Sequence, residues 1–113
     1  MTGRLPSALF IGGLMRRAQQ EGGNAAVLAR GDEQAGGILL VIAERGVTAA
    51  ILEHGHGPDG RPAWRDAAPQ VLAGKASLHD YLARRRQADP DLWAVELDIA
   101  DSQRFIAETI AID

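Results

Sequence analysis

Apolar residues recur at helical spacing in the first segment of the chain. Within 5–20 the apolar positions include Phe10, Ile11, Leu14 and Met15, which would lie along one side of a helix. A proline near the start suits a first turn, and two glycines after the segment suit a helix end. The pattern therefore predicts a helix over 5–20.

Three strand-like segments follow, separated by short turns rich in glycine. Residues 24–30 are mostly small and aliphatic, 38–44 are almost entirely apolar, and 47–54 form another aliphatic run. A run that is apolar on both faces belongs in the middle of a sheet. A glycine- and proline-rich loop then leads to a candidate edge strand at 63–67. Because the connections are short, we expect successive strands to be antiparallel neighbours.

The second half of the chain predicts a helix, a strand and a short closing helix. Ser77 is followed three positions later by an acidic residue, which is a variant of the capping box. Pro90 ends the helix that begins there, because the residue before a proline leaves the α region. A strand over 93–99 comes next, and 102–112 again has apolar residues at helical spacing.

The strand 93–99 places apolar and carboxylate side chains on opposite faces. Its odd-numbered positions, beginning with Trp93, are all large and apolar, whereas Glu96 and Asp98 lie on the other face. The two carboxylates would be about 7 Å apart along the strand and could hold a divalent cation only if a third ligand approached. We therefore expect Trp93 to anchor the core and both carboxylates to face water.

Together these elements predict an α+β fold in one domain, 1–113. We expect a single, mostly antiparallel sheet of four to five strands with two or three helices, packed on one face of the sheet. The order along the chain is helix, three or four strands, helix, strand and helix.

The composition is that of an ordinary globular domain. Apolar residues make up 46% and charged residues 24% of the 113 positions, which argues against a disordered chain. The absence of cysteine excludes disulfide bonds, thiolate metal sites and a cysteine nucleophile. The first apolar run is too short to span a membrane, and it ends in two arginines where a signal peptide would have small residues. We therefore expect a cytoplasmic protein without a membrane partner.

Arginines gather at or near the ends of the two longer predicted helices. Arg16 and Arg17 form one cluster, and Arg84, Arg85 and Arg86 form the other. If the two helices packed side by side, the arginines would form one patch for anions or nucleic acid. In the simpler interpretation they complement helix dipoles and pair with the acidic C-terminal segment. We favour the simpler interpretation, because a net charge of −3 is not the basic balance of a nucleic-acid binder.

Two histidines are the weak candidates for a metal site. His54 and His56 lie two positions apart at the end of a predicted strand and could bind zinc if a third ligand came from elsewhere. A glycine-rich segment around histidines is more often a solvated turn. No serine has the sequence context of an activated nucleophile. We therefore predict no catalytic residue, no metal site and no other cofactor.

The predicted order of elements also resembles the core of restriction-like nucleases. Their motif is a Pro-Asp pair, followed later by an acidic residue, one spacer and a lysine. Here Asp91 follows a proline, but Asp98 stands where the lysine should be. Asp32 and Glu53 on the earlier segments also lack a neighbouring lysine, since Lys75 is the only lysine of the chain. The positive charge that would stabilise an attacking hydroxide is therefore missing.

Two long stretches of the chain carry distinctive sequence features. They contain an Arg-Arg pair in the first helix, an Arg-Gly-Asp turn followed by Ala-Gly, and the segment DPDLWAVELD. In these features, from Arg4 to about Asp98, the chain resembles a family of small alphaproteobacterial proteins of unknown function. The resemblance implies a bacterial, cytoplasmic α+β domain and brings no activity with it.

We expect a non-catalytic domain that acts through protein–protein interaction or self-association, because the features of an active site are absent. A nucleic-acid-associated protein that uses the arginine patch is one alternative. A metal-dependent hydrolase or nuclease-like enzyme is the other.

Overall fold

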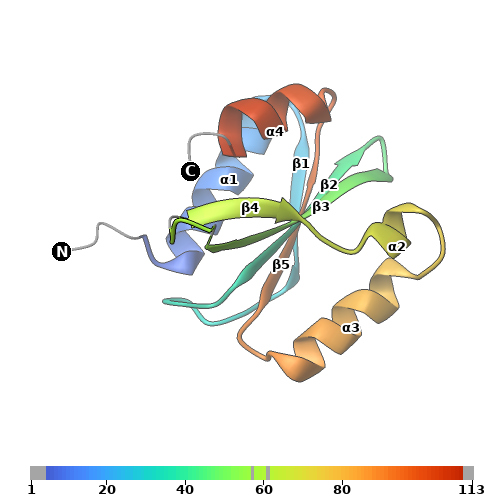
Figure 1. Ribbon diagram of the computed structural model, residues 1–113. Helices are drawn as coiled ribbons and strands as arrows, with labels where there is room; N and C mark the ends of the chain where they lie inside the picture. The colour runs from blue at the N-terminus through green and yellow to red at the C-terminus, as the bar shows by residue number, and fades with distance from the viewer. Residues whose placement is uncertain (1–4, 57, 61, 111–113) are drawn as a thin grey trace.

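The computed structural model describes residues 5–56, 58–60 and 62–110 and confirms the α+β class (Figure 1). One five-stranded sheet is combined with four helices, of which α2 is a single short turn. The elements follow in this order: α1 (Ser7–Gln20), β1 (Asn24–Ala29), β2 (Ile38–Glu44), β3 (Val47–His56), β4 (Pro62–Asp66), α2 (Pro69–Leu72), α3 (Leu78–Ala88), β5 (Trp93–Asp98) and α4 (Ser102–Ile110).

The strands are arranged in the order β1-β5-β2-β3-β4. The pairs β2–β3 and β3–β4 are antiparallel neighbours, as the short connections predicted. The expectation for β1 and β2 was wrong, because β5 lies between them, antiparallel to β1 and parallel to β2. The return of the chain through α3 makes this insertion possible, since a parallel pair needs a crossover connection.

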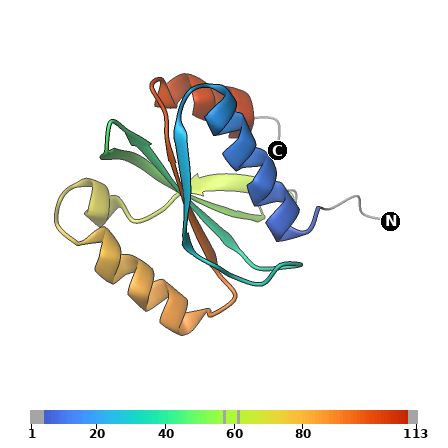
Figure 2. The same ribbon diagram turned by 180° about the vertical axis from the view of Figure 1, so that it is seen from behind.

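Helices cover both faces of the sheet, which corrects the expectation that they pack on one face (Figures 1 and 2). Helices α1 and α4 lie on one side, and α2 and α3 lie on the other. The reason is in β2, whose side chains are buried alternately against the two layers. Leu40 belongs to the cluster under α1 and α4, and Leu39 belongs to the cluster under α3. A strand that is apolar on both faces needs cover on both.

The larger core lies between the sheet and the helices α1 and α4. Strand β5 contributes the predicted apolar row, and Trp93 is only 3% exposed. Phe105 of α4 is fully buried in the same cluster. The prediction that Trp93 anchors the core is therefore confirmed.

A second, smaller core joins the opposite face to α3. Its largest buried members are Leu39, Ile51, Tyr81 and Leu92. Ser77 begins α3 as expected, because its Oγ accepts a hydrogen bond from the Asp80 N–H at 3.1 Å. None of the helices in the described parts of the chain is long and apolar enough to cross a membrane.

Candidate functional site

Strand β3 is twice as long as the edge strand beside it. Its ten residues meet only five residues of β4, and the pairing covers only 52–56. The N–H of Ala67 still donates to the Ile51 carbonyl at 2.8 Å, and Ala68 then adopts a left-handed conformation (φ 52°). The chain leaves the sheet at this point to form α2. As a result, residues 47–50 form an open edge, with no further strand beside them among the described residues.

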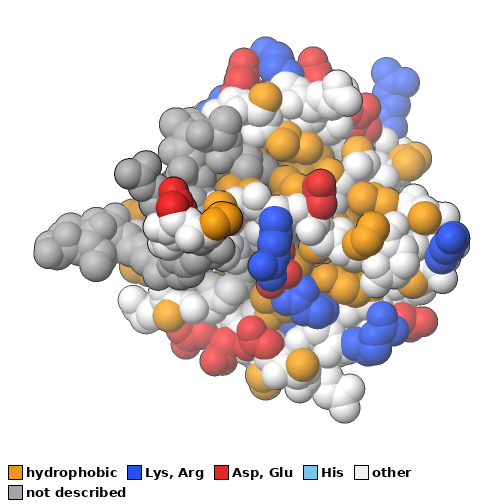
Figure 3. Space-filling view, in the orientation of Figure 1, with side chains coloured by type: hydrophobic (Ala, Val, Ile, Leu, Met, Phe, Trp, Pro, Cys, Tyr) orange, Lys and Arg blue, Asp and Glu red, His pale blue; other side chains and the backbone are white. Residues whose placement is uncertain are grey.

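A depression of about 570 Å³ lies beside this open edge. It lies between the β2–β3 hairpin and the start of α4, and Figure 3 shows hydrophobic side chains gathered over the surface between α4 and α2. Val47 is 70% exposed, and Leu72 of α2 is also exposed. The lining residues are Glu44, Val47, Thr48, Ala49, Ala100, Asp101, Ser102 and Gln103.

Carboxylates form the polar wall of the depression. Glu44 accepts hydrogen bonds from both the hydroxyl and the backbone N–H of Ser102, the latter at 3.0 Å. These bonds hold the pKa of Glu44 below its ordinary value, so this side chain carries its negative charge at neutral pH. The Asp101 carboxylate accepts from the Arg104 N–H at 3.1 Å and caps α4. The first turn of α4 therefore has carboxylates of the chain itself at its N–H groups and is no site for an anion.

The β1 edge is the second uncharged edge of the sheet. Strand β1 pairs only with β5, carries no charged residue, and leaves Val27 and Leu28 each 43% exposed. Strand β4, at the opposite edge, has the protection common on natural edges, because it begins with a proline and carries Arg65 and Asp66.

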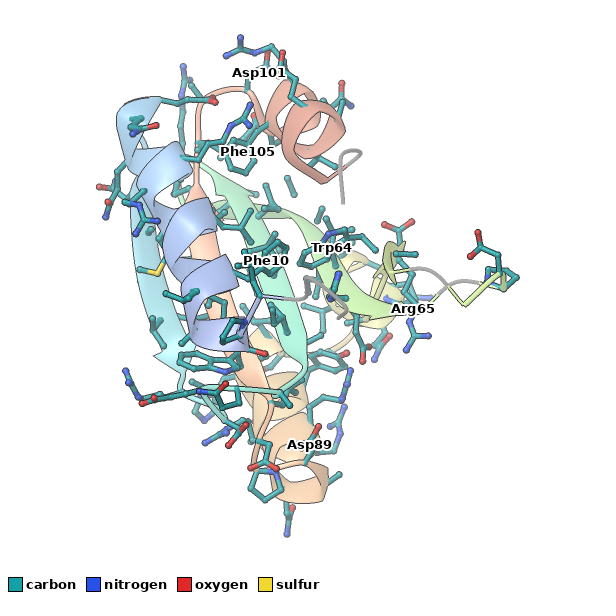
Figure 4. The ribbon with its side chains drawn as sticks, turned by 90° about the vertical axis from the view of Figure 1, so that its left-hand side faces the viewer. Phe10, Trp64, Arg65, Asp89, Asp101 and Phe105 are labelled. Carbon is teal, nitrogen blue, oxygen red and sulfur yellow. The ribbon has the colours of Figure 1, made fainter. Side chains whose placement is uncertain are left out.

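The two candidate histidines do not form a metal site in the described parts of the chain. The His54 ring packs at a tilt against two aromatic rings on the α1 side of the sheet, with ring centroids 5.4 Å from Phe10 and 4.8 Å from Trp64. Phe10 and Trp64 approach this point from α1 and β4 (Figure 4). The side chain of His56 lies outside the described residues. No group of three or more His, Asp or Glu side chains that could hold a metal ion occurs within the described ranges.

Glu53, one of the carboxylates of the nuclease comparison, is engaged in an ion pair. Arg85 of α3 donates to both of its oxygens, at 2.8 and 3.0 Å, and also to the Tyr81 hydroxyl at 2.8 Å. Arg65 of β4 adds a longer contact of 3.5 Å. The Arg85 hydrogen bonds lower the pKa of Glu53, and the same bonds raise the pKa of Arg85. This arrangement ties α3 to the sheet and leaves no carboxylate free to bind a metal there.

The other predicted carboxylates also hold turns. The Asp32 carboxylate accepts hydrogen bonds from the backbone N–H groups of Gln34 and Ala35 in its own loop. Asp98 was expected to face water, but it accepts from the backbone N–H groups of Arg45 and Gly46 at 2.9 and 2.7 Å. It thereby fixes the β2–β3 hairpin, in which both residues have positive φ. Glu96 is half-buried on the same face of β5.

The structure does not bring the two arginine clusters together. Arg16 and Arg17 lie on α1, and the second cluster lies on α3 across the sheet (Figure 2). Arg17 pairs with Glu21 and with Glu108 of the C-terminal helix, each at 3.5 Å. Within the described residues, Arg85 of the second cluster pairs with Glu53 of β3 and not, as expected, with the acidic C-terminal segment.

Arg86 completes the end of α3. It donates to the carbonyl oxygens of Pro90 and Leu92, the latter at 3.0 Å. Arg84 is exposed, whereas Arg85 and Arg86 are half-buried. Because the two clusters also lie on opposite faces of the sheet, the five arginines do not form one patch.

The two stretches that carried the family resemblance meet in space. The loop between β1 and β2 crosses the start of β5, where the Trp93 Nε1–H donates to the Asp32 carbonyl at 2.7 Å. A Cβ added to Gly31 or to Gly36 would lie 2.2 Å from the Asp91 carbonyl oxygen. Only glycine allows the two backbones to approach so closely. The Arg-Gly-Asp turn and the DPDLW segment are therefore explained by packing.

A protein-family profile described as "Protein of unknown function (DUF1491)" matches residues 5–107. The chain belongs to the DUF1491 family. The crystal structure of a DUF1491 family protein from Caulobacter crescentus CB15 is 29% identical, has a TM-score of 0.76, and aligns over 90% of this chain and 94% of that one. The solution structure of protein Atu0922 from A. tumefaciens is 28% identical with a TM-score of 0.60, over 90% and 92%. A search of curated proteins finds no match.

These comparisons confirm the resemblance to an alphaproteobacterial family of unknown function. The NMR structure of a DUF1491 family protein from the same Caulobacter strain is also similar, at 29% identity and a TM-score of 0.67, over 89% and 91% of the two chains. The similarity to DUF1491 family proteins therefore extends over nearly the whole chain.

Sequence reasoning missed this open edge. The available signal was the length of the β3 segment, which exceeds that of the following strand. Unequal neighbours in an antiparallel pair leave part of the longer strand unpaired.

Proposed function

We propose that this protein is a non-catalytic interaction domain that binds an extended segment of another protein at the open edge of β3. The observation that carries the proposal is the unpaired, uncharged backbone at 47–50 beside a depression. Natural proteins usually blunt such an edge with charges, proline or a β-bulge, or cover it. This edge has a register shift between Thr48 and Ala50 but no charge and no proline. An edge that is kept accessible can take an added strand, with main-chain hydrogen bonds for affinity and neighbouring pockets for specificity.

The carboxylates of the molecule favour this function over catalysis. Glu44, Glu53 and Asp98 each accept hydrogen bonds that hold elements of the fold together. The nucleic-acid alternative receives less support, because its arginines lie on opposite faces of the sheet. Binding through the backbone of an edge strand needs neither a catalytic group nor a basic patch.

Self-association through β1 is the second candidate. The observation that favours it is the uncharged β1 edge with two exposed aliphatic side chains, Val27 and Leu28. Two β1 strands could pair in an antiparallel manner about a two-fold axis, the commonest symmetry of soluble oligomers. A lysine at either edge would oppose strand addition there.

A matched pair of variants tests both candidates. Val47→Lys places a charge on the open edge of β3, and Val27→Lys makes the same change on β1. Selection from a phage-displayed peptide library should yield binders of the wild type that bind Val27→Lys equally and fail to bind Val47→Lys. Peptides that bind both variants alike would refute the β3 site. A dimer in light scattering that Val27→Lys converts to a monomer would support β1 self-association instead.

A further inference from the structure

The charges around the open edge of β3 are placed at its two ends. At one end the depression is lined by Glu44 and Asp101, and none of its eight lining residues is basic. At the other end Asp66, the last residue of β4, is exposed and lies opposite Leu52. The stretch 47–51 between these ends contains no charged side chain.

The acidic groups at both ends lie on the same side of the sheet. Asp66 is in register with Leu52, whose side chain packs in the core under α1 and α4. Asp101 caps α4, which covers that same face. A strand that entered alongside 47–50 would therefore meet a carboxylate near each of its ends, both on its α4 side.

Basic groups nearby offset these carboxylates only in part. Arg104 contacts Asp101 at 3.8 Å, but both side chains are about 60% exposed, so this ion pair is weak. A basic group of a bound segment could replace Arg104 beside Asp101. Arg45 is exposed on the hairpin, and its charge contributes to the lowered pKa of Glu44. The two ends of the edge therefore keep an acidic character.

From this charge arrangement, and on the basis of the proposed function, we infer that the bound segment has a basic residue at each end and uncharged, aliphatic residues between. Five residues of extended chain span about 14 Å at roughly 3.4 Å per residue. A basic residue on each side of a three-residue core stands four positions from the other, so the two basic residues would flank a core that lies along 47–50. Side chains at i and i+4 of a strand also share one face, so both could reach the carboxylates on the α4 side.

Three synthetic peptides with a common core test the inference. Each is acetylated and amidated and has the core Val-Thr-Val, flanked by Arg on both sides, by Gln on both sides or by Glu on both sides. Their dissociation constants are measured from the amide chemical shifts of 47–50 in the ¹⁵N-labelled full chain. The Arg peptide should bind about three- to tenfold more tightly than the Gln peptide, as expected for two exposed ion pairs. The Glu peptide should bind most weakly.

The double variant Asp66→Asn, Asp101→Asn provides the control. Asparagine still caps a helix, so α4 should remain intact. The variant should remove the advantage of the Arg peptide and leave the affinity of the Gln peptide unchanged, and 0.5 M salt should reduce the same advantage in the wild type.

The possible outcomes separate the two proposals. Equal binding of all three peptides at 47–50 would overturn the inferred charge pattern while supporting strand addition. Shifts that are absent from 47–50 with all three peptides would overturn both. Shifts confined to β1 with all three peptides would also overturn both and would favour the β1 edge.

Discussion

The indole N–H groups of the two tryptophans are in opposite situations. The Trp93 N–H donates to the Asp32 carbonyl at 2.7 Å, and the ring is almost fully buried. The Trp64 Nε1 is buried and has no hydrogen-bond partner among the residues that the structure describes. Replacing each tryptophan by phenylalanine removes the same N–H and the same ring volume. The two substitutions therefore differ in whether a hydrogen bond is lost and in the burial of the ring, because Trp64 is only half-buried.

The structure predicts effects of different size. Trp93→Phe loses a hydrogen bond with a net value of about 1 kcal/mol and leaves a small cavity, so we expect a loss of about 2 kcal/mol in the free energy of unfolding. Trp64→Phe also loses ring volume, but it removes a buried polar group whose unsatisfied burial costs about 1–3 kcal/mol. We expect its free energy of unfolding to stay within about 1 kcal/mol of the wild type. Trp93→Ala, which removes the whole ring, should cost about 3–5 kcal/mol.

Urea unfolding followed by far-ultraviolet circular dichroism measures these differences without relying on indole fluorescence. Because 1 kcal/mol corresponds to about 4 °C in a domain of this size, the melting temperatures of the two phenylalanine variants should differ by several degrees. Equal destabilisation of the two variants, or a larger loss for Trp64→Phe, would show that the hydrogen-bond assignment of the two indoles is wrong. The hydrogen bond from the Trp93 indole to the Asp32 carbonyl would then make no net contribution to the free energy of unfolding.

The sequence predicted the features that depend on local periodicity. The alternation of 93–99 predicted the buried row headed by Trp93, and the residue spacing after Ser77 predicted the start of α3. Both patterns reflect neighbours within a few positions along the chain. Such features need no knowledge of what packs against them.

The features that were missed depend on partners far apart in sequence. The place of β5 between β1 and β2 results from a crossover through α3, and short-connection reasoning favours sequential neighbours instead. For the helices on both faces, by contrast, a local signal existed: the run 38–44 is apolar on both sides of its strand, and such a strand needs cover on both. The cluster of rings around His54 joins α1, β3 and β4, so no local pattern could reveal it.

Three further predictions concern metal, close packing and the ion pair under α3. Dialysis against a chelator should leave the melting temperature unchanged, because the described residues contain no ligand group for a structural metal; a loss of many degrees that zinc restores would contradict this. Gly36→Ala should lower the free energy of unfolding, measured in urea, by about 1–3 kcal/mol, because its Cβ would meet a backbone oxygen at 2.2 Å. Gly13→Ala, which has open space around it in α1, should raise the free energy of unfolding by about 1 kcal/mol. Similar effects of the two substitutions would refute the close contact at Gly36. Glu53→Gln should cost about 1–3 kcal/mol at pH 7, because it leaves Arg85 without its charged partner. The pKa of Glu53 is lowered in the folded state, so the stabilisation by its charge is complete above the unfolded pKa of about 4.3 and is lost as the pH falls through the folded value. The Gln variant cannot titrate at this position and should therefore lose less stability than the wild type between pH 7 and pH 3, measured by urea unfolding at each pH. Glu33→Gln, in an exposed pair, should follow the wild type; identical acid dependence of the two Gln variants would show that Glu53 does not stabilise α3 through its charge.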